Sequence, residues 1–234
     1  PRSLTEPIVQ YTLEPLVYEG PAEGWPKEEW KLRSPRELLD LKICDMACGS
    51  GAFLVQACRY LSALLVEAWE REEAAHPGLP GITPEGAPST GRPGESLIPK
   101  DTGERLTFAQ RLVAQRCLYG VDKNPLAVEM AKLSLWLLTL AKNKPFNFLD
   151  HAIRPGDSLI GIHDLDQIRY FTLDLEDKQK AFFTGAMEAA VEEVIELRRR
   201  IESRPADSVE DAEVQQRLLE EAEAKSKRLG YAAD

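Results

Sequence analysis

Three acidic residues stand where apolar runs of the sequence end, and each side chain is suited to accept hydrogen bonds from a ligand. Asp45 and Asp122 end the runs 41–45 and 117–122, and Asp157 ends a third run that begins near residue 147. Helical patterns separate these runs, which predicts parallel strands in βαβ units. Because ligands bind at the carboxyl edge of such a sheet, we expect the three carboxylates to gather there.

The stretch DMACGSGAF (45–53) places two glycines between the first strand and a helix predicted over 52–73. Glycine adopts backbone angles that other residues avoid, and it lets a ligand approach the main chain. The start of a helix also offers N–H groups that have no partner within the helix. We therefore expect a ligand-binding turn. The GxGxxG and GxxxxGK[ST] fingerprints of dinucleotide and phosphate sites are both absent.

Two of the acids also have a purely structural interpretation. Asp122 and Asn124 precede Pro125 and are able to cap the helix predicted over 124–142. Asp45 is similarly able to act as a cap before the helix 52–73. An acid at the end of the second strand commonly accepts hydrogen bonds from ribose hydroxyls, which favours Asp122 as a ribose ligand.

These motifs resemble those of a known family, the S-adenosylmethionine-dependent N6-adenine DNA methyltransferases of restriction-modification type. DMACGSGAFL (45–54) resembles their DPACGSG-type motif. Further motif regions of the large type IIG/IIS-like members are similar to LYGVDKNPLAVEMAKLSLWL (118–137), GDSL (156–159) and PRSLTEPIV (1–9). The resemblance covers residues 1–161. Met46 stands where the family usually has proline, which loosens the turn without removing a ligand.

The resemblance implies S-adenosylmethionine as the cofactor, and it implies a role for each residue of these motifs. The residues that would hold the methionine part are Asp45, Ala47, Cys48, Gly49, Ser50 and Gly51. Those that would hold the adenosine part are Asp122, Lys123, Asn124, Asp157, Ser158 and Leu159. Asp122 would accept from the ribose, and Asp157 from the adenine amine. Phe53 and Leu159 would line the pocket, with plain core packing as the alternative for Phe53.

No catalytic residue is identified in the chain. The family shares an Asn/Asp-Pro-Pro-aromatic tetrapeptide that accepts from the adenine amine and stacks on the flipped base. The chain has no such tetrapeptide, and Asn124-Pro125-Leu126 lacks the second proline and the aromatic ring. We expect a cofactor-binding fragment whose catalytic motif lies beyond Asp234, with a target-recognition region or partner subunit. The alternatives are a methyltransferase acting on RNA or protein, and a non-catalytic assembly module.

Composition is that of a globular protein with one core and an appendage. The 234 residues are 43% hydrophobic, and the net charge of −10 argues against a generally basic nucleic-acid-binding surface. The family resemblance nevertheless implies double-stranded DNA as a partner of the full-length enzyme. No apolar run reaches the ~20 residues of a membrane span, which favours a cytoplasmic protein without membrane contact. The four cysteines form no CxxC pair, favouring reduced, buried thiols over a metal site or disulfide.

The predicted fold class is α/β, with a Rossmann-like methyltransferase sheet over 1–173 and a charged helical hairpin over 174–234. The core is interrupted at 76–103, where six prolines and six glycines predict a flexible surface insertion that cannot be core. Residues 174–234 contain 16 acids and 10 bases and include two amphipathic helices. The hairpin is expected to be a scaffold, with direct contact to DNA or protein as the alternative.

The remaining elements complete the prediction. Apolar spacing predicts a first helix over 3–18, and a further helix is expected near 105–116. Residues 19–30, rich in glycine and proline, are expected to form a loop.

Overall fold

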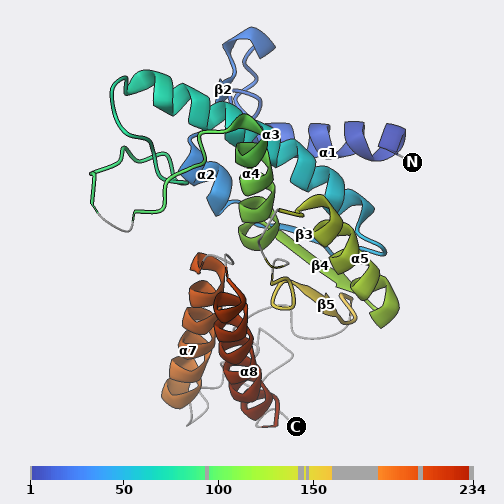
Figure 1. Cartoon of the computed structure of the whole chain (residues 1–234). Coiled ribbons are helices and arrows are strands. Elements are labelled where there is room, and N and C mark those ends of the chain that lie inside the picture. The colour runs from blue at the N-terminus through green and yellow to red at the C-terminus, as the bar shows by residue number, and fades with distance from the viewer. Residues whose placement is uncertain are drawn as a thin grey trace. The chain divides into compact units, whose positions relative to one another are not determined.

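The chain divides into two compact units between Gly156 and Asp157, and each is described by itself. The structure, a computed structural model (Figure 1), describes residues 2–92, 95–141, 145, 148–159, 184–204 and 208–231. The predicted division between residues 173 and 174 lies outside the described residues.

A three-stranded parallel sheet positions the candidate site in the first unit. Its strands are β3 (Ile43–Asp45), β4 (Leu118–Asp122) and β5 (Ile153–Pro155), in the order β3-β4-β5. In this register Asp45 lies opposite Gly120, and Asp122 lies opposite Pro155. The predicted α/β class with parallel strands is confirmed. The third strand is shorter than predicted and ends two residues before Asp157.

Three helices pack around this sheet, and all three lie close to their predicted ranges: α3 (Ala52–Ala75), α4 (Thr102–Arg116) and α5 (Pro125–Leu138). Among the described residues, α3 is also the helix long and apolar enough to cross a membrane. Its apolar side chains belong to the core instead, since Leu54, Leu61, Leu65 and Trp69 are at most 1% exposed.

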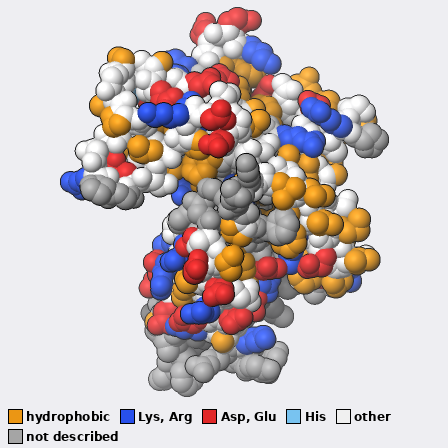
Figure 2. Space-filling model, in the orientation of Figure 1, with side chains coloured by type: hydrophobic (Ala, Val, Ile, Leu, Met, Phe, Trp, Pro, Cys, Tyr) orange, Lys and Arg blue, Asp and Glu red, His pale blue; other side chains and the backbone are white. Residues whose placement is uncertain are grey.

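Helix α5 is apolar on two sides, as its sequence indicates. Its N-terminus is fixed by Asn124, whose side chain accepts the N–H of Leu126 at 3.0 Å. The side toward the core buries Val128, Ala131 and Leu135. Figure 2 shows hydrophobic side chains gathered over the outer side of this helix. The exposed apolar residues there are Leu126, Met130, Leu133 and Leu137.

The predicted first helix is present as α1 (Arg2–Val17), which packs on α3 through Val9, Leu13 and Val17. The segment predicted as a loop, 19–30, contains part of a small antiparallel pair instead. Strand β1 (Tyr18–Glu19) pairs with β2 (Lys31–Leu32), and the short 3-10 helix η1 (Lys27–Glu29) lies between them.

A further helix, α2 (Pro35–Asp40), was absent from the sequence prediction. It has a clear start signal. The Ser34 hydroxyl accepts the N–H of Glu37, and the Glu37 carboxylate accepts the N–H of Ser34 at 3.0 Å. Pro35 occupies the first helical position. Six residues are too few for a helical hydrophobic pattern to stand out, and the capping box is the local feature that identifies this helix.

The insertion corrects the expectation that residues 76–103 stay out of the core. Ile82 and Ile98 are 1% and 5% exposed and belong to the main apolar cluster. The buried indole N–H of Trp69 donates to the carbonyl of Pro84 at 2.7 Å. Proline and glycine do prevent regular structure, because only an isolated bridge between Ile82 and Pro88 occurs in the described part of the segment before α4. They do not prevent docking, since two buried isoleucines and one hydrogen bond hold an irregular chain against α3.

The second unit contains two packed helices, α7 (Thr184–Ser203) and α8 (Val209–Tyr231), where the sequence predicts amphipathic helices. Buried apolar residues from both helices form their contact: Val191, Leu197, Ile201, Leu218, Leu219 and Ala222. The buried amide of Gln215 donates to the carbonyls of Ile201 and Arg204 at 3.0 and 3.2 Å. These bonds connect α8 to the C-terminal end of α7.

Candidate functional site

The turn after β3 folds back over the end of β4. Gly49 and Gly51 adopt φ angles of +52° and +82°, which non-glycine residues rarely adopt. The N–H of Cys48 donates to the carbonyl of Val121 at 3.0 Å, and that of Gly51 donates to the carbonyl of Cys48 at 2.8 Å. The glycine turn is therefore hydrogen-bonded both to itself and to the neighbouring strand.

The carboxylate of Asp122 connects this turn to the turn after β4. Its Oδ2 accepts the N–H of Gly49 at 2.9 Å, and its Oδ1 accepts the N–H of Asn124 at 2.8 Å. The hydrogen bonds from Asn124 and Gly49 lower the pKa of Asp122. The group is therefore an ionised acceptor at neutral pH. The capping alternative is confirmed for Asn124, which caps α5, and is wrong for Asp122, which does not.

Asp45 occupies the end of the adjacent strand. Its Oδ1 accepts the N–H of Ala47 at 3.1 Å, which orders the beginning of the glycine turn. The alternative that Asp45 caps α3 is wrong as well, since the N-cap residue is Gly51 and no side chain caps that end. Among the described residues, no side chain caps the N-terminal end of α3.

Close packing beneath the turn involves Gly120, which the sequence prediction of the site missed. A Cβ on Gly120 would lie 2.9 Å from Cδ1 of Leu54 and 3.2 Å from Sγ of Cys48. A glycine inside a strand is a signal for such close approach. Cys48 is 5% exposed, and its burial, together with the nearby carboxylates of Asp45 and Asp122, raises its pKa to about 11. The Cys48 thiol is therefore neutral and packs as a small apolar group.

A cavity of about 240 Å³ opens at the carboxyl end of β3, between α1 and the start of α3. Its lining residues are Ile8, Val9, Thr12, Leu13, Ile43, Cys44, Asp45, Met46, Phe53, Leu54 and Ala57. Phe53 lines it and is 42% exposed, so the alternative of plain core packing is wrong. The α1 residues were missing from the predicted site, although their segment carried part of the family resemblance.

The structure brings the turn residues and Asp122 together, but it does not place every predicted residue. Lys123 is exposed, next to Asp122 in the chain. Asp157, Ser158 and Leu159 belong to the second unit. The Asp157 side chain accepts the N–H of Leu159 at 3.0 Å, and Leu159 is 91% exposed. The cofactor-binding roles of these four residues, like those of all the other predicted site residues, stay predictions.

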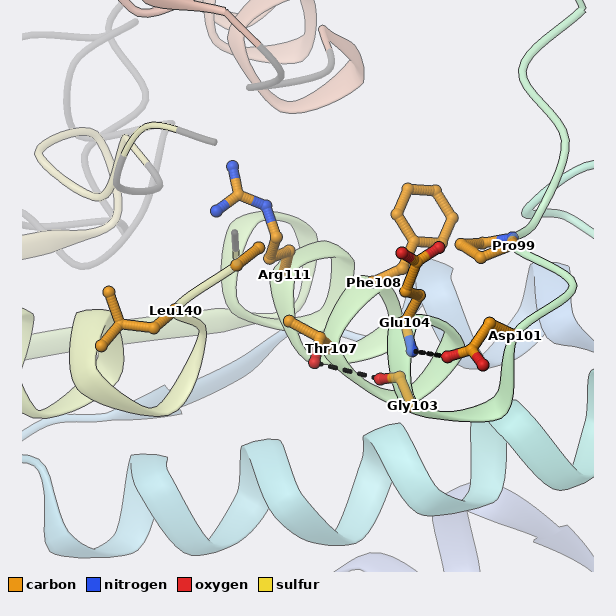
Figure 3. A pocket seen from close by; sticks show the side chains of 9 residues that line it. Pro99, Asp101, Gly103, Glu104, Thr107, Phe108, Arg111 and Leu140 are labelled. Atoms are coloured by element: carbon orange, nitrogen blue, oxygen red, sulfur yellow. Dashed lines mark hydrogen bonds between the residues drawn. The ribbon is translucent and has the colours of Figure 1, made fainter. Parts of the chain in front are cut away.

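A second and larger cavity, of about 440 Å³, lies beside α4 and contains none of the predicted site residues (Figure 3). Two of its polar groups already have structural partners. Asp101 caps α4 by accepting the N–H of Glu104, and buried Arg111 donates to the carbonyl of Pro145 at 2.9 Å. The strand-end cavity is the better candidate because Asp45 and Phe53 of the predicted site line it.

Comparison with known proteins identifies the family of this chain. The family model described as MmeI, DNA-methyltransferase domain, matches residues 26–168, which include β3, the glycine turn, β4 and β5. The chain belongs to the MmeI DNA-methyltransferase domain family. The predicted resemblance to restriction-modification DNA methyltransferases is thereby confirmed.

A curated relative is similar to part of this chain. It is the type II restriction enzyme and methyltransferase RM.Eco57I of Escherichia coli, 26% identical over 146 residues. The match covers 58% of this chain and 13% of the relative, so the chain spans a small part of that protein's length. No solved structure matches the chain.

Proposed function

We propose that the first unit is the S-adenosylmethionine-binding part of an enzyme that methylates adenine N6 in double-stranded DNA, in a restriction-modification or phage-defence system. The observation that carries this proposal is the hydrogen bond between Asp122 Oδ2 and the N–H of Gly49, which joins two strand-end turns at one edge of the sheet. The family supports DNA over RNA or protein as the substrate class. The relative's description supports the restriction-modification setting.

The residues of this edge fit such a cofactor. Asp122 offers an ionised carboxylate, the acceptor that a pair of ribose hydroxyls requires. Among the described residues, no atom beyond Gly49 and its two chain neighbours lies within 4 Å of the position that a Cβ on Gly49 would occupy, so a ligand has room to approach the backbone there. The apolar walls contributed by Ile8 and Phe53 would shield the ligand from water.

The proposed role of each residue follows the sequence prediction. Asp45 and the glycine turn would hold the methionine part, Asp122 the ribose, and Lys123 and Asn124 the surroundings of the adenine. When bound, the cofactor would supply a methyl group on sulfonium sulfur for in-line transfer. The chain has no Asn/Asp-Pro-Pro-aromatic sequence, so this part alone would bind without methylating.

Calorimetry of this chain with S-adenosylhomocysteine tests the cofactor assignment. Asp122→Ala should weaken binding about tenfold or more, because it removes a charged acceptor from the ribose site. Asp101→Ala is the matched control, since it removes a carboxylate that only caps α4. Equal affinity of the wild type and Asp122→Ala would refute the ribose assignment.

Tritiated methyl transfer tests the reaction. We expect incorporation into duplex DNA, at adenine N6, by the full-length enzyme and none by this chain. Incorporation by the chain at the rate of the full-length enzyme would show that a catalytic group had been missed. Transfer by the full-length enzyme to RNA or protein and not to DNA would contradict the proposed substrate.

A further inference from the structure

Helix α5 contacts the glycine turn directly. A Cβ on Gly51 would lie 3.1 Å from both Cα and Cβ of Ala131, so the backbone of the turn lies against the helix at this point. The hydroxyl Oγ of Ser134 lies 3.0 Å from the carbonyl oxygen of Ser50. Ala131 and Ser134 are three residues apart and share one face of α5. That face therefore contacts two successive residues of the turn.

Ser134 contacts the C=O of a peptide group whose N–H is also hydrogen-bonded. The N–H of the Ser50–Gly51 peptide donates to the carbonyl of Cys48 at 2.8 Å. Its C=O accepts from Ser134, and within the described part of the chain no other donor reaches it. With both ends bonded, the plane of this peptide is fixed, and the orientation of the turn at the start of α3 is fixed with it.

A competing acceptor exists for the same hydroxyl. Ser134 Oγ also lies 2.8 Å from the carbonyl of Met130, four residues earlier in α5, and a serine has one hydroxyl proton. The carbonyl of Met130 is already the acceptor for the helical N–H of Ser134. The Ser50 carbonyl therefore loses more than the Met130 carbonyl if the hydroxyl is removed.

We propose that Ser134 is a positioning residue for the cofactor turn, donating its hydroxyl proton to the Ser50 carbonyl and thereby fixing the Ser50–Gly51 peptide. The inference rests on the proposed cofactor site, and it assigns α5 a part in cofactor binding without contact to the cofactor. Removing the hydroxyl should loosen the turn and weaken cofactor binding. A threonine at this position, which keeps a hydroxyl, should restore the order of the turn and the affinity for the cofactor.

Hydrogen exchange measured by mass spectrometry on peptides spanning 47–55, without ligand, tests the positioning itself. Ser134→Ala should speed exchange there about fivefold, the effect of losing one typical hydrogen bond. Ser134→Thr should restore protection, because threonine keeps a hydroxyl donor at this position. Ser226→Ala is the control, since its hydroxyl donates only to the carbonyl of Ala222 in α8 at 2.8 Å.

Calorimetry with S-adenosylhomocysteine on the same variants should show an equal, about fivefold, loss of affinity in Ser134→Ala and recovery in Ser134→Thr. Unchanged exchange at 47–55 in Ser134→Ala would overturn the proposal, because the hydroxyl proton of Ser134 would then be donated to the carbonyl of Met130. If the wild type failed to bind, the proposed function would be refuted. The exchange result, obtained without ligand, would still decide the role of Ser134 in holding the turn.

Discussion

Replacing Gly51 with alanine should destabilise the first unit through two separable effects. The φ angle of +82° costs an L-residue about 1–2 kcal/mol. The new Cβ would lie 3.1 Å from Cα and Cβ of Ala131, and forcing a methyl into a filled space costs about 1–3 kcal/mol. Alanine also reduces the conformational entropy of the unfolded chain, which offsets about 0.4–1 kcal/mol of this destabilisation. The free energy of unfolding should therefore fall by about 2–4 kcal/mol.

Two other glycines separate these effects. Gly49 also has a positive φ, of +52°, but no atom lies within 4 Å of its Cβ position, so Gly49→Ala should cost only about 1 kcal/mol. Gly120 has no positive φ, but its Cβ would lie 2.9 Å from Cδ1 of Leu54. Gly120→Ala should therefore cost about 1–3 kcal/mol from crowding alone.

Urea unfolding followed by tryptophan fluorescence measures the free energy of unfolding of the first unit in all three variants. The four tryptophans (Trp25, Trp30, Trp69 and Trp136) lie in the first unit, so the signal reports its unfolding. We expect the order of losses to be Gly51→Ala above Gly49→Ala, at an unchanged denaturant slope. Equal losses at Gly49 and Gly51 would refute the close approach of the turn to Ala131.

Three further results are expected. A thiol reagent at neutral pH should modify exposed Cys44 and leave Cys48 unmodified, because burial and two carboxylates raise the pKa of Cys48 to about 11. Equal labelling of the two cysteines, measured by mass spectrometry, would contradict this. Trp69→Phe removes the hydrogen bond to Pro84, so limited proteolysis should cut within 79–92 faster than in the wild type, and an unchanged rate would count against docking. Asp122→Asn should lower the free energy of unfolding above pH 3.8, the ordinary pKa of aspartate, because a pKa lowered by folding contributes stability in that pH range. The difference between wild type and variant should vanish as the pH falls through the folded-state pKa of Asp122. Urea midpoints at neutral pH and at about pH 2 would check this.

Local sequence signals predicted the elements of the site well. The switch from an apolar run to helical spacing located β3 and α3, and Pro125 after Asn124 located the start of α5. The acids at the strand ends followed from the same pattern, because strand boundaries and ligand edges coincide in parallel sheets.

Contacts between distant segments were harder to predict. The burial of Ile82 depends on a place in the core that α3 and α4 create, which no local pattern encodes. The hydrogen bond from Ser134 to Ser50 joins residues 84 apart, and a serine inside a helix has no feature that distinguishes it from a surface residue. The third strand was overestimated in length, because an apolar run does not show where pairing with a neighbour stops.

The bond between Gly49 and Asp122 joins residues 73 positions apart, on either side of the insertion, and this separation has a consequence for synthesis. On a ribosome the glycine turn emerges well before the strand that orients it. Pairing of parallel strands is non-local, so it must wait for the later segment. A ligand at this edge can therefore stabilise only the completed sheet, and it has no site on the nascent N-terminal half. Cutting the gene within the insertion would place the two halves of the site on separate polypeptides, and ligand binding would then report their reassociation.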